Sequence, residues 1–280
     1  MSYSAEISRQ NPTCILFVVD QSGSMTDAMS GSESETKAAF LATAVNRNLQ
    51  DLVIKCARAE GVRDYYSVGG IGYGATVGPA FSGSLAGKPL VMLSEVADNP
   101  ARLEDRTRKV SDGAGGLVEE NFKLPIWFDP IAENGTPMCE ALGQACTVLA
   151  NWLAEHPDCF PPVVLHFTDG QSTDGDPVAA MQALTYLSSS DGNVVLFNIH
   201  ISSNPNAREI EFPGQSDELP DPFAQTLYAC SSPLTASMRS VASEDYGMQL
   251  SDSAKAFVMN AHAWLLIAAL DIGTRPSNLR

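Results

Sequence analysis

The sequence predicts an α/β fold with a central, mainly parallel β-sheet and helices on both faces. The first observation is a set of continuous apolar runs at residues 14–20, 161–169 and 193–201. Such runs are typical of strands buried on both faces of a parallel sheet. The second observation is that helical patterns separate these runs, as in successive βαβ units. The prediction includes one antiparallel strand at an edge of the sheet.

The elements of the first half follow from local patterns. Residues 1–13 are polar and form a lead-in. Apolar residues then recur at helical spacing over 36–60, and Gly61 is a suitable stop. Residues 64–75 predict a strand rather than a nucleotide-binding loop, because "GGIGYG" lacks the G-x-G-x-x-G order and no helix follows it. Residues 88–96 are predicted to pair with that strand.

The middle of the chain holds an irregular segment and two helices. Residues 97–134 are mixed in charge and are interpreted as a surface excursion. A strong amphipathic helix is predicted over 137–156, with a proline in its first turn, where the missing N–H costs nothing. Asp176 and Pro177 resemble an N-cap and first helical residue, and they predict a helix that ends near residue 187.

The last eighty residues begin with a loop. Residues 202–225 contain four prolines and five acidic residues. A short strand is predicted near 227–229, followed by helices over 233–242 and 251–270. No repeat or linker divides the chain, so residues 1–280 are predicted to form one domain, with 76–134 as an enlarged edge hairpin or insertion.

The composition excludes some classes of partner. The 33 acidic and 17 basic residues give a net charge of −16, which disfavours nucleic acid and anionic membranes. The first twenty residues lack the charged and apolar segments of a secretory leader. No CxxC pair occurs among the six cysteines, which are interpreted as reduced thiols. A cytoplasmic protein is therefore expected, and its oligomeric state is left open.

Small hydroxyl residues follow two of the predicted strands where each ends in an aspartate. Asp20 lies in "VVDQSGSM", together with Ser22 and Ser24, and Asp169 lies in "HFTDGQST". Ligands bind at the carboxyl ends of strands in an open parallel sheet. Thr136, in "NGTPM", precedes a core helix and is expected at the same rim. Two carboxylates and three hydroxyls are hard oxygen donors, which suit Mg²⁺ or Mn²⁺ better than zinc.

This constellation resembles the metal-ion-dependent adhesion site of von Willebrand factor A (vWA) domains. The shared features are Asp-x-Ser-x-Ser after an apolar strand, a threonine in a "GTP" loop and an aspartate in "TDG". The resemblance covers residues from about 14 to 202 and implies a Rossmann-like, three-layer fold. It implies that Mg²⁺, with Mn²⁺ or Ca²⁺ as possible substitutes, is held by Asp20, Ser22, Ser24, Thr136 and Asp169. It also implies a protein partner whose Glu or Asp completes the coordination of the metal.

Finer features are similar to those of bacterial stand-alone vWA proteins encoded near tellurite-resistance-type genes. These features are "PIWFDPIAENGTPM", "TDGQSTDGDP" and "LDIGTR". The resemblance implies a role in signalling, stress response or defence beside a protein kinase and a protein phosphatase. One departure is the interval of 112 positions from Ser24 to Thr136, which is longer than in compact adhesion-type domains. The surplus falls in 76–134.

Other interpretations stay open at this stage. Each site residue taken alone could be structural, as a turn serine, a helix cap or a strand-end aspartate. Asp174 and Asp176 are predicted to be turn and cap residues. A metal-dependent phosphohydrolase is a competing hypothesis, but the rim loops offer no clear basic residue to clamp a phosphate. A structural subunit with a vestigial metal site is the other alternative. The expectation is a binding module rather than an enzyme.

Overall fold

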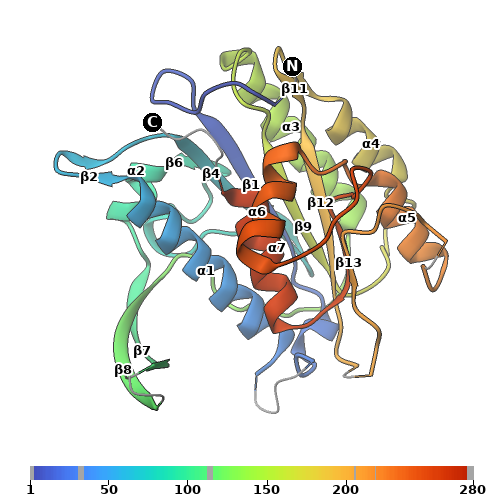
Figure 1. Cartoon of the computed structure of the whole chain (residues 1–280), viewed down its shortest axis with the longest axis horizontal. Helices are drawn as coiled ribbons and strands as arrows, with labels where there is room; N and C mark the ends of the chain where they lie inside the picture. The colour runs from blue at the N-terminus through green and yellow to red at the C-terminus, as the bar shows by residue number, and fades with distance from the viewer. Residues whose placement is uncertain (1–2, 31–34, 112–115, 205, 218, 276–280) are drawn as a thin grey trace.

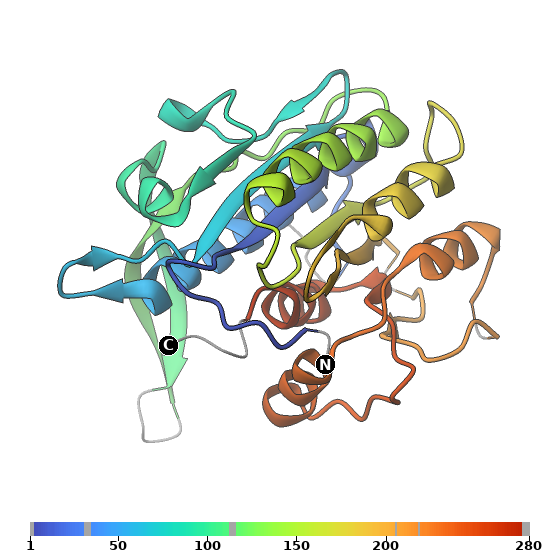
Figure 2. The same ribbon diagram turned by 90° about the horizontal axis from the view of Figure 1, so that it is seen from above.

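A computed structural model shows a central sheet between two helical layers (Figures 1 and 2). It describes residues 3–30, 35–111, 116–204, 206–217 and 219–275. Eight strands form the sheet in the order β13 (Ile210–Glu211), β14 (Phe257–Ala261), β12 (Val195–Ile201), β9 (Val163–Thr168), β1 (Thr13–Asp20), β4 (Tyr66–Tyr73) and β5 (Val77–Pro79), with β6 (Leu90–Met92) also paired to β4.

The five inner strands, from β14 to β4, are parallel. The α/β class with a mainly parallel sheet is therefore confirmed. The edges differ from the prediction of a single antiparallel strand. Both β5 and β6 pair antiparallel with β4, and β13 pairs antiparallel with β14 at the opposite edge.

Strand β1 shows why the inner strands are apolar throughout. Ile15 and Phe17 face one hydrophobic core, whereas Leu16 and Val18 face another on the opposite side of the sheet. Side chains of a strand alternate between faces, so a strand with a core on each side cannot show polar alternation.

Helices cover both faces of the sheet (Figures 1 and 2). The first layer contains α1 (Lys37–Cys56) and α7 (Ala263–Thr274), and α6 (Ala236–Tyr246) packs against α7. The second layer contains α3 (Met138–Glu155), α4 (Val178–Tyr186) and α5 (Pro222–Cys230). No helix among the described residues has the length and apolar character needed to cross a membrane.

Shorter elements occupy the connections. They are η1 (Gly23–Thr26), β2 (Ala57–Arg58), β3 (Gly61–Val62), η2 (Gly83–Leu85), α2 (Leu93–Asp98), β10 (Ser188–Ser189) and β11 (Gly192–Asn193). The helix predicted over 36–60 ends at Cys56 because the chain turns into the β2–β3 hairpin, where Gly61 has a φ of 120°. The strand predicted over 88–96 is likewise shorter, since α2 begins at Leu93.

A long hairpin lies within 97–134, but the prediction of a surface excursion fails for the end of that range, where Trp127 and Phe128 are buried in the core. Strands β7 (Arg102–Ser111) and β8 (Leu117–Ile126) pair antiparallel and project from the body at the lower left of Figure 1. The tip residues 112–115 lie outside the described part of the chain. Near the base, the β8 side packs against α1, where the Arg47 guanidinium lies 5.6 Å from the centre of the Phe122 ring.

Two predictions near the C-terminus were wrong. The short strand expected at 227–229 is part of α5, whose start is favoured by the Asp221 carboxylate, which accepts from Ala224 N, and by Pro222 at the first turn. The helix expected over 251–270 is a strand, β14, followed by α7. A short apolar run suits either element, and pairing with β12 decides for the strand.

Candidate metal centre

The ends of β1 and β9 bring the two predicted aspartates to one rim. The strands are parallel neighbours, with Val19 opposite Phe167 in the ladder. Asp20 is the last residue of β1, and Asp169 directly follows β9. Because parallel strands end at the same edge of a sheet, residues far apart in sequence meet there.

Asp20 is buried and ties the two loops together. One of its carboxylate oxygens, Oδ1, accepts from Ser22 N at 2.9 Å. The other, Oδ2, accepts from the Thr168 hydroxyl and from Asp169 N, both at 3.3 Å. Burial raises the pKa of Asp20 to about 6, with opposing effects from the Ser22 hydrogen bond, which lowers it, and the Asp169 charge, which raises it. Asp20 therefore organises the rim from beneath.

Three oxygens form a compact triangle above Asp20. Ser22 Oγ and Ser24 Oγ are 3.0 Å apart, and Asp169 Oδ1 lies 2.8 Å from Ser24 Oγ and 3.5 Å from Ser22 Oγ. Neighbouring ligands of an octahedral Mg²⁺ site, with bonds of about 2.1 Å, are about 3 Å apart. The spacing and chemistry of this triangle therefore fit one face of a site for a small, hard cation.

Lys37 is the site residue that the sequence interpretation missed. Its Nζ lies 2.6 Å from Asp169 Oδ2 and 3.6 Å from Asp27 Oδ2, and the residue is only 3% exposed. The sequence interpretation considered basic residues in the rim loops only, and this lysine is the first residue of α1 rather than part of a loop. One weak local signal was present, since a helix dipole disfavours a cation at the N-terminus unless a nearby carboxylate offsets it.

Thr136 lies on the same rim, in a loop that contacts both aspartate loops. Glu133 N donates to Gln21 O at 2.6 Å. Thr136 O accepts from Thr173 N, and Thr136 N donates to the Thr173 hydroxyl, both at 3.0 Å; Thr173 lies in the loop after Asp169. Within the described residues, no hydrogen bond joins the Thr136 hydroxyl to the other four predicted ligands. The structure thus brings four of the five together directly and places the fifth on a neighbouring loop.

Asp174 and Asp176 bind backbone N–H groups at helix starts, although Pro177, predicted as a first helical residue, takes the N-cap position and α4 begins at Val178. The carboxylate of Asp174 accepts from Cys139 N and Glu140 N in the first turn of α3, and that of Asp176 accepts from Val178 N at the start of α4. Across the described ranges, no three His, Cys, Asp or Glu side chains cluster in a way that could hold a metal. Any metal at this rim would therefore depend largely on hydroxyl ligands.

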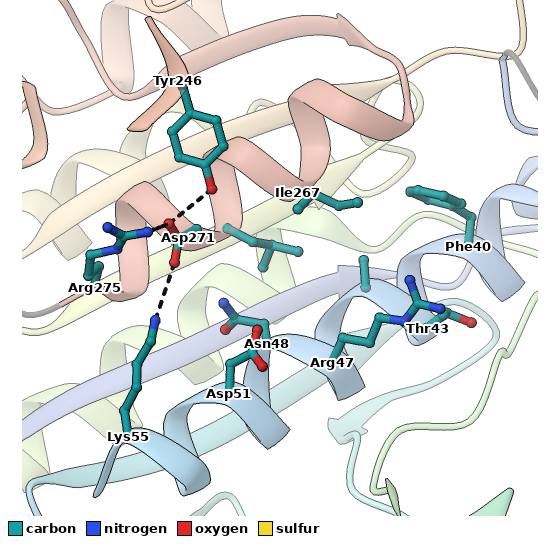
Figure 3. A pocket seen from close by; sticks show the side chains of 12 residues that line it. Phe40, Thr43, Arg47, Asn48, Asp51, Lys55, Tyr246, Ile267, Asp271 and Arg275 are labelled. Atoms are coloured by element: carbon teal, nitrogen blue, oxygen red, sulfur yellow. Dashed lines mark hydrogen bonds and ion pairs between the residues drawn. The ribbon is translucent and has the colours of Figure 1, made fainter. Parts of the chain in front are cut away.

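A separate cavity of about 360 Å³ lies between α1, α6 and α7 (Figure 3). Asp271 is at its centre: its carboxylate accepts from the Tyr246 hydroxyl at 2.9 Å, lies 3.5 Å from Lys55 Nζ and pairs with Arg275. None of the lining residues belongs to the rim. The Asp271 carboxylate is already paired with Lys55 and Arg275, and Arg47 and Asp51 also line the cavity.

Comparisons with known proteins give only distant structural similarities. They include the vWF domain of the type V pili tip protein Mfa5 from Porphyromonas gingivalis (14% identity, TM-score 0.29) and the ArnB paralog VWA2 from Sulfolobus acidocaldarius (12%, 0.34). The PilB minor pilin from Streptococcus sanguinis is similar at 14% identity with a TM-score of 0.31. The matches cover 58%, 70% and 60% of this chain, respectively.

The chain spans only 39%, 36% and 31% of the lengths of those three structures. No family model matches the sequence, and no curated protein matches it. Similarities of this size do not assign the chain to a family.

Proposed function

We propose that this chain is a vWA-type protein-interaction module that binds a divalent cation, first of all Mg²⁺, at the rim of its sheet. The triangle formed by Ser22 Oγ, Ser24 Oγ and Asp169 Oδ1 is the observation that carries the proposal. Asp20 holds these groups from below, and Thr136 supplies a further hydroxyl from the neighbouring loop. Mn²⁺ and Ca²⁺ are the alternative ions.

A site of this composition favours binding a partner over catalysis. Two hydroxyls and one carboxylate neutralise a divalent cation incompletely, so a bound ion attracts one more anionic oxygen. A Glu or Asp on a protein partner has the required chemistry. The net charge of −16 favours a carboxylate set in a basic or neutral surface, because a broadly acidic partner would be repelled.

The proposed setting follows from the finer sequence resemblance described above. It is a bacterial cytoplasm and a stress-response, signalling or defence system with kinase and phosphatase partners. The structure adds no observation that favours the alternative of a phosphohydrolase. The one buried cation at the rim, among the described residues, is Lys37, and Asp169 and Asp27 already engage it rather than leaving it open to a phosphate.

Metal-dependent thermal unfolding tests the proposal. Protein stripped with chelator is titrated with Mg²⁺, Mn²⁺ and Ca²⁺, comparing wild type with Asp20→Ala. An ion that binds only the folded state raises the unfolding midpoint as its concentration increases. We expect that rise in wild type and its loss in Asp20→Ala.

The control is Asp105→Ala, which removes one exposed carboxylate from the β7–β8 hairpin and should keep the response. An equal rise in Asp20→Ala would place the ion elsewhere. No rise in wild type at millimolar metal would favour the alternative of a vestigial site. With the metal response established, a pull-down in Mg²⁺ and in chelator identifies the partner.

A further inference from the structure

We propose that Lys37 is a tethered counter-cation that stabilises the metal-free rim and lowers its affinity for a divalent ion. This inference rests on the proposed function, since it concerns the same site. The ammonium group would thus regulate the affinity of the rim for the metal, a role that the ligand residues do not have.

Contacts of both the main chain and the side chain hold Lys37 in place. Lys37 N donates to Asp27 O at 2.9 Å, which anchors the start of α1 to the turn after β1. Thr36 caps the helix by accepting from Ala39 N at 3.2 Å. The lysine side chain is 4% exposed, and its ammonium lies within ion-pair distance of the Asp169 and Asp27 carboxylates.

Local preference does not explain this arrangement. Burial of an ammonium is costly unless it is paired, and the positive end of a helix dipole disfavours a cation at this position. The contact with Asp169 offsets both costs. The Asp169 side chain is only 1% exposed, so its charge is also paired inside the protein rather than in water.

Asp169 divides its two oxygens between two functions. The first, Oδ1, faces the serine hydroxyls of the candidate metal site, and Oδ2 faces the Lys37 ammonium. A divalent ion at the triangle and the ammonium would therefore share one carboxylate. Two cations on either side of the same group repel each other, and each reduces the negative charge available to the other.

Removing the Lys37 ammonium should have two consequences. With no ammonium, the metal meets less repulsion and a more negative Asp169, so it binds more tightly. In the metal-free state, however, Asp169 and Asp27 lose their counter-charge and the fold loses stability. The metal-free midpoint should therefore fall in Lys37→Met, while the rise produced by Mg²⁺ should increase.

The test compares the Mg²⁺ dissociation constants of wild type, Lys37→Met and Lys55→Met, measured by calorimetry and by the concentration dependence of the unfolding midpoint. Lys55 lies near the other end of α1 and pairs with Asp271, so its replacement removes the same charge away from the rim. We expect a dissociation constant roughly tenfold lower in Lys37→Met and little change in Lys55→Met. Lys37→Gln, which keeps a neutral donor to Asp169, serves if the methionine variant does not fold.

The outcomes separate this inference from the proposed function. Metal binding in Lys37→Met but not in wild type supports it, because the ammonium then replaces the ion. Equal or weaker binding in Lys37→Met, with a response in wild type, overturns the inference and leaves the metal site standing. No binding in either protein overturns both. An equal gain in Lys55→Met also overturns it, since the effect would then come from net charge alone.

Discussion

The hydroxyl of Ser24 donates to Oδ1 of Asp169 at 2.8 Å, across 145 positions of sequence. This bond joins the turn after β1 to the loop after β9 at the rim of the sheet. Ser24 is exposed, whereas the Asp169 side chain is almost completely buried. The pair therefore combines a hydroxyl open to a ligand with a carboxylate held in place by the protein.

Ser24→Ala should separate metal binding from folding. The substitution removes an exposed hydroxyl, so the free energy of unfolding in chelator should fall by only about 1 kcal/mol. The Mg²⁺-dependent rise in the unfolding midpoint should be lost or much reduced, because one corner of the oxygen triangle is gone. Thermal unfolding with and without Mg²⁺ measures both effects.

Thr26→Val is the matched control for that variant. The Thr26 hydroxyl lies in the same short helix but donates to Gly23 O rather than to Asp169. Thr26→Val should therefore leave the Mg²⁺-dependent rise in the unfolding midpoint unchanged. A full response in Ser24→Ala would exclude this serine as a ligand.

The meeting of Asp20, Ser22, Ser24 and Asp169 could be predicted because it depends on one robust rule. Continuous apolar runs identify buried parallel strands, and parallel strands end at the same rim. Thr136 was harder, since its loop does not follow one of the two strands but precedes α3. The structure places its backbone against Thr173 at that rim.

Other features could not be predicted because they depend on tertiary context. The run at 257–261 suits a helix or a strand, and only the free edge of β12 selects the strand. Lys37 was missed because it stands at the start of α1 rather than in a loop that follows a strand. Its unfavourable place at a helix N-terminus was the one local clue.

Gly69→Ala should destabilise the fold through β4. A Cβ at Gly69 would lie 2.2 Å from Pro89 O and 2.7 Å from a Leu90 methyl group. A backbone carbonyl cannot move aside cheaply, so we expect a loss of about 1–3 kcal/mol in the free energy of unfolding. Urea denaturation measures it.

Gly143→Ala provides the opposite case for the Gly69 experiment. Gly143 lies within α3, and a Cβ there would meet nothing within 4 Å. Alanine should stabilise this exposed helical position by about 1 kcal/mol. Equal effects from the two substitutions would contradict the close approach seen at β4.

Asp174→Ala should weaken the start of α3. Pro137, at the N-cap position of this helix, makes no side-chain capping bond, and the Asp174 carboxylate accepts from two first-turn N–H groups instead. Its removal should cost about 1 kcal/mol of unfolding free energy, and Asp174→Asn should cost less because one acceptor remains. Urea denaturation of both variants measures the two losses of unfolding free energy. Equal losses in Asp174→Ala and Asp174→Asn would show that the remaining oxygen acceptor of the asparagine contributes nothing.

A buried polar network beneath the rim centres on His166. Its Nε2 lies 2.9 Å from the Tyr73 hydroxyl and its Nδ1 lies 2.7 Å from Asn198 Oδ1. The Asn198 amide donates to Leu227 O and Ser231 Oγ, so its oxygen accepts from Nδ1–H of the histidine. A neutral imidazole with its proton on Nδ1 fits this network: it donates to Asn198, and at Nε2 it shares the single Tyr73 hydroxyl proton with Phe167 O, which also lies 2.9 Å from that hydroxyl.

Stability should therefore fall in mild acid through His166. Burial lowers its pKa from the ordinary 6.5 to about 4, although the Asn198 hydrogen bond opposes this shift. Below pH 6.5 the unfolded chain takes up a proton that the folded chain refuses, so this contribution is complete above pH 6.5 and is lost as pH falls towards 4. The loss should reach about 3 kcal/mol by pH 4.

Urea denaturation across this range should show a shallower pH dependence of the unfolding free energy in His166→Gln than in wild type. A wild-type slope retained in His166→Gln would assign the acid sensitivity to other groups.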